Sequence, residues 1–234
     1  AQITTGMNLK PSSIPMLDAV QSKRYLMDVY QSRGYSAGDI QKLPFINDTK
    51  PEQHSWGYEG NADYYRYNKN TDWQDQLFVQ GFKQNYSIGV MGGDDVALYA
   101  LSLGYLQNEG LVKGTDFSRF SARINTDINF SPKFTVQTNM NFVYGKKNLM
   151  QEGNASPQNP IYASLVKSPF MAGFTYNEQD QLSPNYEEVD LFGMSNPTAI
   201  VDNMLQENIS YGFFANIHLK YKIWKELTLS TRFG

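Results

Sequence analysis

The 234-residue chain carries 20 Lys or Arg against 23 Asp or Glu, a formal net charge of -3, and it contains no cysteine. A chain without excess positive charge is poorly suited to nucleic acid, because phosphate binding needs many Lys and Arg side chains. The absence of thiols excludes disulfide frameworks, thiolate metal sites and cysteine nucleophiles. The two histidines, His54 and His218, are too few and too far apart in the sequence to predict a metal cluster.

Aromatic residues make up 14% of the chain, with 16 Tyr and 14 Phe. A tyrosine ring suits an apolar layer while its hydroxyl suits water, so this composition favours membrane-interface girdles or stacking on carbohydrate. Tyr-rich strands of an ordinary β-domain are the alternative. No apolar run approaches the ~20 residues of a membrane helix, so any contact with a bilayer would be made by strands.

Residues 1–9 predict a weak first strand, and residues 16–33 predict a helix that Asp18 caps and Gly34 ends. From 35 to 71 the chain is polar and aromatic without a period. A stretch of this kind predicts a long loop, and long loops are usually functional or disordered.

Alternating strand texture begins at residue 81 and continues to residue 90. The Gly-Gly-Asp-Asp sequence at 92–95 predicts a tight turn. It does not predict a phosphate cradle, because the residues that follow, 96–107, have the pattern of a strand and not of a helix. A medium loop at 108–116 leads into the most informative stretch of the chain.

That stretch is a predicted hairpin whose arms are 117–130 and 134–145, joined by the break at 131–133. In each arm the polar residues share one parity and the apolar residues the other, which is the period of a β-strand. Each arm exceeds ten residues, which at ~3.3 Å per residue and ~40° tilt spans the ~25 Å apolar band of an outer-membrane barrel. A one-residue slip would expose Arg119 and Arg123 to lipid, at roughly 2–4 kcal/mol each.

Residues 146–208 form the longest irregular segment and contain five prolines, and 209–222 and 227–234 predict two further strands around a short turn. Short connections therefore alternate with long ones. An up-and-down outer-membrane barrel alternates tight periplasmic turns with extended external loops in this way, whereas a Greek-key sandwich has no reason to do so. The predicted fold class is all-β, a segment of a transmembrane antiparallel up-and-down β-barrel with a short loop helix, in which 10–80 and 146–208 are long extracellular loops.

Short motifs between residues 70 and 130 are specific in combination. In chain order they are Asn70-Thr71-Asp72-Trp73-Gln74-Asp75, Gln84-Asn85-Tyr86, Gly92-Gly93, Leu103-Gly104-Tyr105-Leu106-Gln107-Asn108-Glu109-Gly110, Phe117-Ser118-Arg119 and Ser121-Ala122-Arg123-Ile124-Asn125. Together they resemble the SusC/RagA family of TonB-linked outer-membrane importers of Bacteroidetes. The rest of the chain resembles that family mainly in its general pattern of strands and loops.

The resemblance implies a barrel of about 22 strands with an N-terminal plug. It also implies a SusD-like surface lipoprotein that closes as a lid, and import powered by TonB through a TonB box, in the cell outer membrane. The sequence lacks the plug, the TonB box and most of the strands, so 1–234 resembles a partial TonB-dependent receptor barrel domain. Six or seven strands with open edges need other polypeptide to complete them, because unpaired edge groups find no water inside a membrane.

Two sets of residues are candidates for contact with a solute. The candidate lumen-facing residues, whose amide and guanidinium groups can bond sugar hydroxyls or plug backbone, are Arg119, Arg123, Asn125, Gln137, Asn139 and Asn141. The loop aromatics that could stack on sugar rings or on the lid protein are Trp56, Tyr58, Tyr64, Tyr65 and Tyr67. Solvation of the barrel interior or anchoring of a plug is the alternative for the first set, and packing within the loop is the alternative for the second.

The principal hypothesis is therefore part of a nutrient importer, for oligosaccharides or alternatively peptides, with no catalytic residue, no metal and no cofactor. A secreted carbohydrate-binding β-sandwich is the second hypothesis, and it requires short strands and an apolar layer shared by two sheets. A glycoside hydrolase is the third. It rests on the scattered carboxylates Asp63, Asp72, Glu109 and Glu188, which no spacing pairs as acid and base.

Overall fold

The computed structural model describes residues 1–234 except 47–61, 151–152, 154, 178, 189 and 205. The chain divides into two compact units, which are described separately. The sheet unit consists of Ala1–Lys10, Gln80–Leu149 and Leu205–Gly234, and the helical unit consists of Pro11–Val79 and Met150–Met204.

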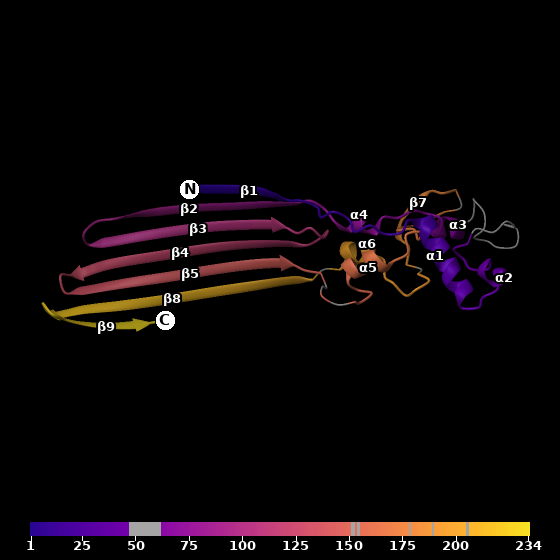
Figure 1. The fold of residues 1–234 in the computed structure, drawn as a ribbon. Coiled ribbons are helices and arrows are strands. Elements are labelled where there is room, and N and C mark those ends of the chain that lie inside the picture. The colour runs from indigo at the N-terminus through magenta and orange to yellow at the C-terminus, as the bar shows by residue number, and fades with distance from the viewer. Residues whose placement is uncertain (47–61, 151–152, 154, 178, 189, 205) are drawn as a thin grey trace. The chain divides into compact units, whose positions relative to one another are not determined.

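The sheet unit is one antiparallel sheet of seven strands in the order β1-β2-β3-β4-β5-β8-β9 (Figure 1). The strands are β1 (Gln2–Asn8), β2 (Gly81–Gly93), β3 (Ala97–Glu109), β4 (Asp116–Ser131), β5 (Phe134–Asn148), β8 (Glu207–Trp224) and β9 (Leu227–Phe233). The five central strands contain 13 to 18 residues, well above the five or six or so of a typical globular strand. The all-β, up-and-down fold class expected from the sequence is confirmed.

The connections of the sheet alternate in length as the sequence predicts. The turns at 94–96, 132–133 and 225–226 are short, and the connections at 9–80, 110–115 and 149–206 are longer. In the first turn Asp94 accepts hydrogen bonds at Oδ1 from the main-chain N–H groups of Val96 and Ala97, at 2.8 and 2.9 Å. Gly93 has φ 143, and a Cβ there would meet the Ala97 carbonyl oxygen at 2.1 Å, so the turn requires glycine at this position.

The helical unit contains six helices and a small hairpin within the residues described. These elements are α1 (Ala19–Ser32), α2 (Ala37–Ile40), α3 (Ala62–Tyr67), α4 (Trp73–Leu77), α5 (Pro160–Val166), β6 (Phe174–Tyr176), β7 (Leu182–Tyr186) and α6 (Pro197–Asn203). The predicted helix is confirmed, because Asp18 forms a capping box with Gln21 at the start of α1 and Gly34 has φ 88 after its end.

The expectation that 35–71 and 146–208 lack regular elements is wrong for the residues the structure describes. The helices within these two stretches contain only four to seven residues, too few to produce a visible period. Two prolines that suggested breaks, Pro160 and Pro197, stand instead in the first turn of α5 and α6. In both helices the preceding Asn caps the helix by accepting main-chain N–H bonds with its side chain.

The predicted loops 10–80 and 146–208 pack together around one hydrophobic core. Its buried members are Ile40, Phe45, Ile46, Tyr67, Trp73, Phe170 and Met171. The Phe45 and Phe170 rings stack with centroids 5.1 Å apart, and Trp73 Nε1 donates to the Ser168 carbonyl at 3.0 Å. The segments that the sequence separates as two loops are therefore one folded body.

The stability of the helical unit should depend on pH through Lys23 on α1. Its ammonium donates to Asn68 Oδ1 at 2.6 Å and lies 5.6 Å from the centre of the Phe170 ring. Burial lowers the pKa of Lys23 from 10.5 to about 8. Between about pH 8 and 10.5 the unfolded chain therefore holds this proton and the folded chain does not, so the helical unit becomes more stable as the pH rises through that window.

The measurement is the denaturant midpoint of the helical unit in the complete protein, followed from pH 7 to pH 10 and compared with a Lys23→Met variant. As the pH rises, the denaturant midpoint of the natural chain should increase relative to that of the Lys23→Met variant. Parallel curves over the whole range would contradict the assignment, because Met carries no proton to release.

Candidate transport surface: the two faces of the sheet

One face of the sheet is apolar, and it is uncovered within the part of the chain that the structure describes. The register pairs Phe120 with Tyr144, Ile124 with Met140 and Phe142 with Phe213 on this face. Phe120, Ile124, Phe142 and Phe213 are 38%, 43%, 38% and 71% exposed. A sandwich would bury these side chains against a second sheet. Large exposed apolar patches of this kind mark membrane or protein contact.

Aromatic side chains form a row across the apolar face. The register aligns Tyr86, Tyr105, Phe120, Tyr144 and Tyr211 on five successive strands. A second, shorter aromatic row consists of Phe134 on β5 and Tyr221 on β8, each ten residues from the member of the first row on the same strand. Tyrosine rows at this position are typical of the boundary between hydrocarbon and water.

Between the two aromatic rows, no charged residue lies on the apolar parity of β2 to β5 and β8. Two of the few polar side chains in this band, Thr126 and Thr138, face each other on neighbouring strands and their hydroxyls are hydrogen-bonded. A hydroxyl placed in an apolar medium is costly unless it finds a partner. This pair is satisfied without water.

The opposite face of the sheet is polar and carries all six candidate lumen residues. Arg123 pairs with Asn141, Asn125 with Asn139, and Asp127 with Gln137, and Gln137 Nε2 donates to Asp127 Oδ2. The remaining candidate, Arg119, pairs with Gly145. A hollow of about 310 Å³ opens between β3, β4 and β5 with Asn125, Asp127, Gln137 and Asn139 among its lining residues. Register therefore brings the predicted set onto one surface.

The predicted loop aromatics do not form one exposed surface among the residues that the structure describes. Trp56 and Tyr58 lie outside the described residues. Tyr67 is 5% exposed and belongs to the core of the helical unit, so its ring is not available for stacking. Tyr64 and Tyr65 are half-buried and meet edge to face, with centroids 5.4 Å apart.

Several residues of the polar face were not among the sequence candidates. His218 and Arg232 continue the row of Asp127 and Gln137 onto β8 and β9, and Asn216 continues the row of Asn125 and Asn139. The parity of these positions was visible in the sequence. Their place beside the candidates was not, because it depends on pairing β5 with a strand some sixty residues further along the chain.

No helix among the described residues has the length and apolar character that a membrane span needs. Within the same residues no group of three or more His, Cys, Asp or Glu side chains is placed to hold a metal ion.

No protein-family model matches the chain. Among curated proteins it is 28% identical over 167 residues to TonB-dependent receptor SusC of Bacteroides thetaiotaomicron, covering 65% of this chain and 16% of that protein. It is 26% identical over 223 residues to TonB-dependent receptor P26 of Formosa agariphila, covering 94% of this chain and 19% of that protein. The chain thus spans less than a fifth of the length of these relatives.

A solved structure described as the RagAB peptide transporter has the same fold. It matches with a TM-score of 0.70 at 16% identity, covering 98% of this chain and 27% of the matched chain. At that identity the likeness concerns the fold alone. Fold and relatives together define the sheet as part of a TonB-dependent barrel protein. Within that class the chain is SusC-like and corresponds to a segment of a SusC-like TonB-dependent transporter.

Proposed function

We propose that the chain is part of an outer-membrane, TonB-dependent importer of nutrients. The observation that carries the proposal is the uncharged apolar band between the two aromatic rows. Tyr144 and Phe134 are ten residues apart on β5, which is about 33 Å along a strand and about 25 Å across a membrane at ~40° tilt. That length equals the apolar height of an outer-membrane barrel.

In this arrangement the apolar face meets lipid and the polar face lines a wet lumen. The outer edges of β1 and β9 would pair with further strands, because free N–H and C=O groups cannot be left in hydrocarbon. The short turns would face the periplasm. The segments 10–80 and 146–208, which fold into the helical unit except for a few residues at their ends, would be extracellular, and 1–234 would be one part of the barrel domain.

The solute is proposed to be an oligosaccharide, which the lumen-face residues Arg119, Arg123, Asn125, Gln137, Asn139 and Asn141 would contact through hydrogen bonds to hydroxyl groups. A SusD-like lipoprotein would cover the extracellular mouth, and TonB would act through a part of the protein outside this chain. Peptide import is the second candidate. It is favoured by the fold shared with a transporter that is described as carrying peptides.

The test is uptake in the producing bacterium with and without the gene, and with and without active TonB. Labelled oligosaccharides too large for passive diffusion should enter bacteria that have both the gene and active TonB. They should not enter bacteria that lack the gene or bacteria that lack active TonB. Loss of peptide uptake with unchanged glycan uptake would replace the first solute by the second. Unchanged uptake of both classes, or recovery of the native protein in the aqueous fraction, would contradict the importer.

A further inference from the structure

Charge is divided unequally between the two units of the chain. The sheet unit contains twelve Lys or Arg and seven Asp or Glu, whereas the helical unit contains eight Lys or Arg and sixteen Asp or Glu. The small negative net charge of the whole chain is therefore the sum of a basic sheet unit and an acidic helical unit. The division becomes sharper when the faces of the sheet are considered separately.

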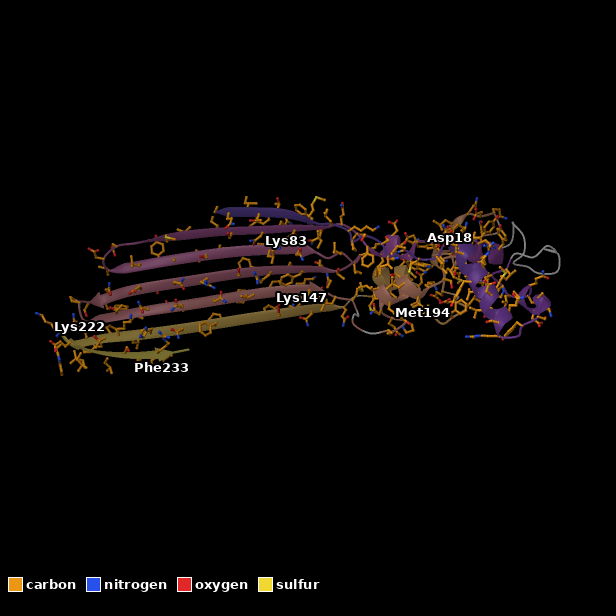
Figure 2. The ribbon with its side chains drawn as sticks, in the orientation of Figure 1. Asp18, Lys83, Lys147, Met194, Lys222 and Phe233 are labelled. Atoms are coloured by element: carbon orange, nitrogen blue, oxygen red, sulfur yellow. The ribbon has the colours of Figure 1, made fainter. Side chains whose placement is uncertain are left out.

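Within the strands the basic side chains gather on the polar face. Seven of the eight strand cations lie there, namely Lys83, Arg119, Arg123, Lys147, Lys220, Lys222 and Arg232. The eighth, Lys146, has the opposite parity and pairs with Glu207 at 2.6 Å. Figure 2 labels Lys83 and Lys147 toward one end of the sheet and Lys222 at the opposite end, so the cations extend along the whole length of the face. The same face carries one carboxylate, Asp127, whose Oδ2 accepts a hydrogen bond from the Gln137 amide.

The other acidic residues of the sheet unit are elsewhere. Glu109, Asp116 and Glu207 have the opposite parity, near strand ends. Asp94, Asp95 and Glu226 are in turns. No ion pair joins any of the seven cations of the polar face to a carboxylate within the described part of the chain.

The surroundings of the arginines suit an anionic ligand. Arg123 lies between Ser102 and Asn141 in the register, and Arg119 lies between Leu106 and Gly145. These neighbours leave both guanidinium groups without a competing carboxylate. A guanidinium matches the planar carboxylate with two parallel hydrogen bonds, which a neutral sugar hydroxyl cannot accept.

We infer that the polar face is a cation-lined path that selects solutes bearing carboxylate groups. This inference rests on the proposed function, because it requires the polar face to line a lumen, and it narrows the solute to an acidic oligosaccharide or an acidic peptide. Water and mobile salt reach such a face, so the field acts by concentrating anions along it and depleting cations. A neutral solute can still accept single hydrogen bonds from these side chains, but it is not concentrated by their charge.

The test measures the local potential with a cysteine at Ser121, which stands between Arg119 and Arg123 on β4. This chain contributes no natural cysteine. In the complete transporter, stripped of any other cysteine, S121C should react roughly ten-fold faster with an anionic methanethiosulfonate than with a cationic one, after correction for their rates with a free thiol. High salt should reduce the preference.

Charge-removing variants locate the source of the preference. R119Q and R123Q, each combined with S121C, should move the ratio of rates toward one, and K133Q in the turn between β4 and β5 should leave it unchanged. Ala122 on the apolar parity supplies the control for the fold, because A122C should resist both water-soluble reagents if it faces lipid. Rapid labelling of A122C would count against the proposed function rather than against the charge of the face.

Competitors identify the chemistry of the solute. A trigalacturonate and a triglutamate at millimolar concentration should slow the reaction of S121C with the anionic reagent, and the galacturonate methyl ester and triglutamine should not. The stronger acidic competitor indicates whether the carboxylates come from a sugar or a peptide. Equal rates for both reagents, an unreactive S121C because polypeptide fills the lumen, or no difference between acidic and neutral competitors would each overturn the inference.

Discussion

Replacing Ile124 by Arg is expected to destabilise the membrane-inserted protein by roughly 2–4 kcal/mol, because it places a charge near the midplane of the lipid-facing band. Ile124 is 43% exposed and lies in register with Leu101 and Met140, close to midway between the two aromatic rows. The measurement is reversible denaturant unfolding of the complete transporter from lipid vesicles. Poor insertion of the variant into the outer membrane should accompany the loss.

Asn125→Arg is the matched control, one residue away on the same strand. Its side chain points to the polar face, where Arg123 is already present. The two variants carry the same new charge and differ in the face that receives it. Similar stabilities for I124R and N125R would mean that both faces of β4 meet the same solvent, and the lipid-facing assignment would then be wrong.

The second large effect is expected in the helical unit, at a buried ion pair. The Lys167 side chain is 0% exposed, and its ammonium lies 3.4 Å from Asp190 Oδ2 and donates to the Met194 carbonyl at 3.0 Å. Burial lowers the pKa of Lys167, and the Asp190 carboxylate opposes that shift. Asp190→Asn keeps the shape and removes the charge, so it should cost about 3–5 kcal/mol by taking away the carboxylate that the buried Lys167 ammonium contacts.

A double variant separates the pair from its packing. Lys167→Met together with Asp190→Asn removes both charges of the pair and should recover most of the lost stability, because residue 167 then carries no charge that needs Asp190 as its partner. The denaturant midpoint of the helical unit in the complete protein measures all three variants. A double variant as unstable as D190N alone would show that packing around residue 190, and not the charge of Lys167, sets the cost.

The sheet was predictable from the sequence because its strands are long. More than ten residues of alternation identify β4 and β5 as strands, and the predicted break at 131–133 locates the hairpin turn, which the structure places at 132–133 after a bulge in β4. The helical unit was predictable only at α1, which has 14 residues and a capping box. The helices of four to seven residues are held by tertiary contacts, such as the Trp73 bond to the Ser168 carbonyl, that no local pattern shows.

The candidate site was predictable one strand at a time. Arg119, Arg123 and Asn125 share a parity with one another, and Gln137, Asn139 and Asn141 do so on the next strand. The alternation within one strand does not show which residues of neighbouring strands lie side by side. The row of five aromatic residues and the excess of cations on one face both depend on pairing β5 with β8 across a connection that folds into a separate unit.

A scan of spin labels along β5 tests the central claim most directly. Labels placed singly from Thr135 to Tyr144 in the vesicle-inserted transporter report their access to oxygen, which concentrates in lipid, and to a water-soluble nickel complex. The account predicts a period of two, with oxygen favoured at the positions of Val136, Thr138, Met140 and Phe142 and nickel favoured at those of Thr135, Gln137, Asn139 and Asn141. Equal access to nickel on both parities would contradict it.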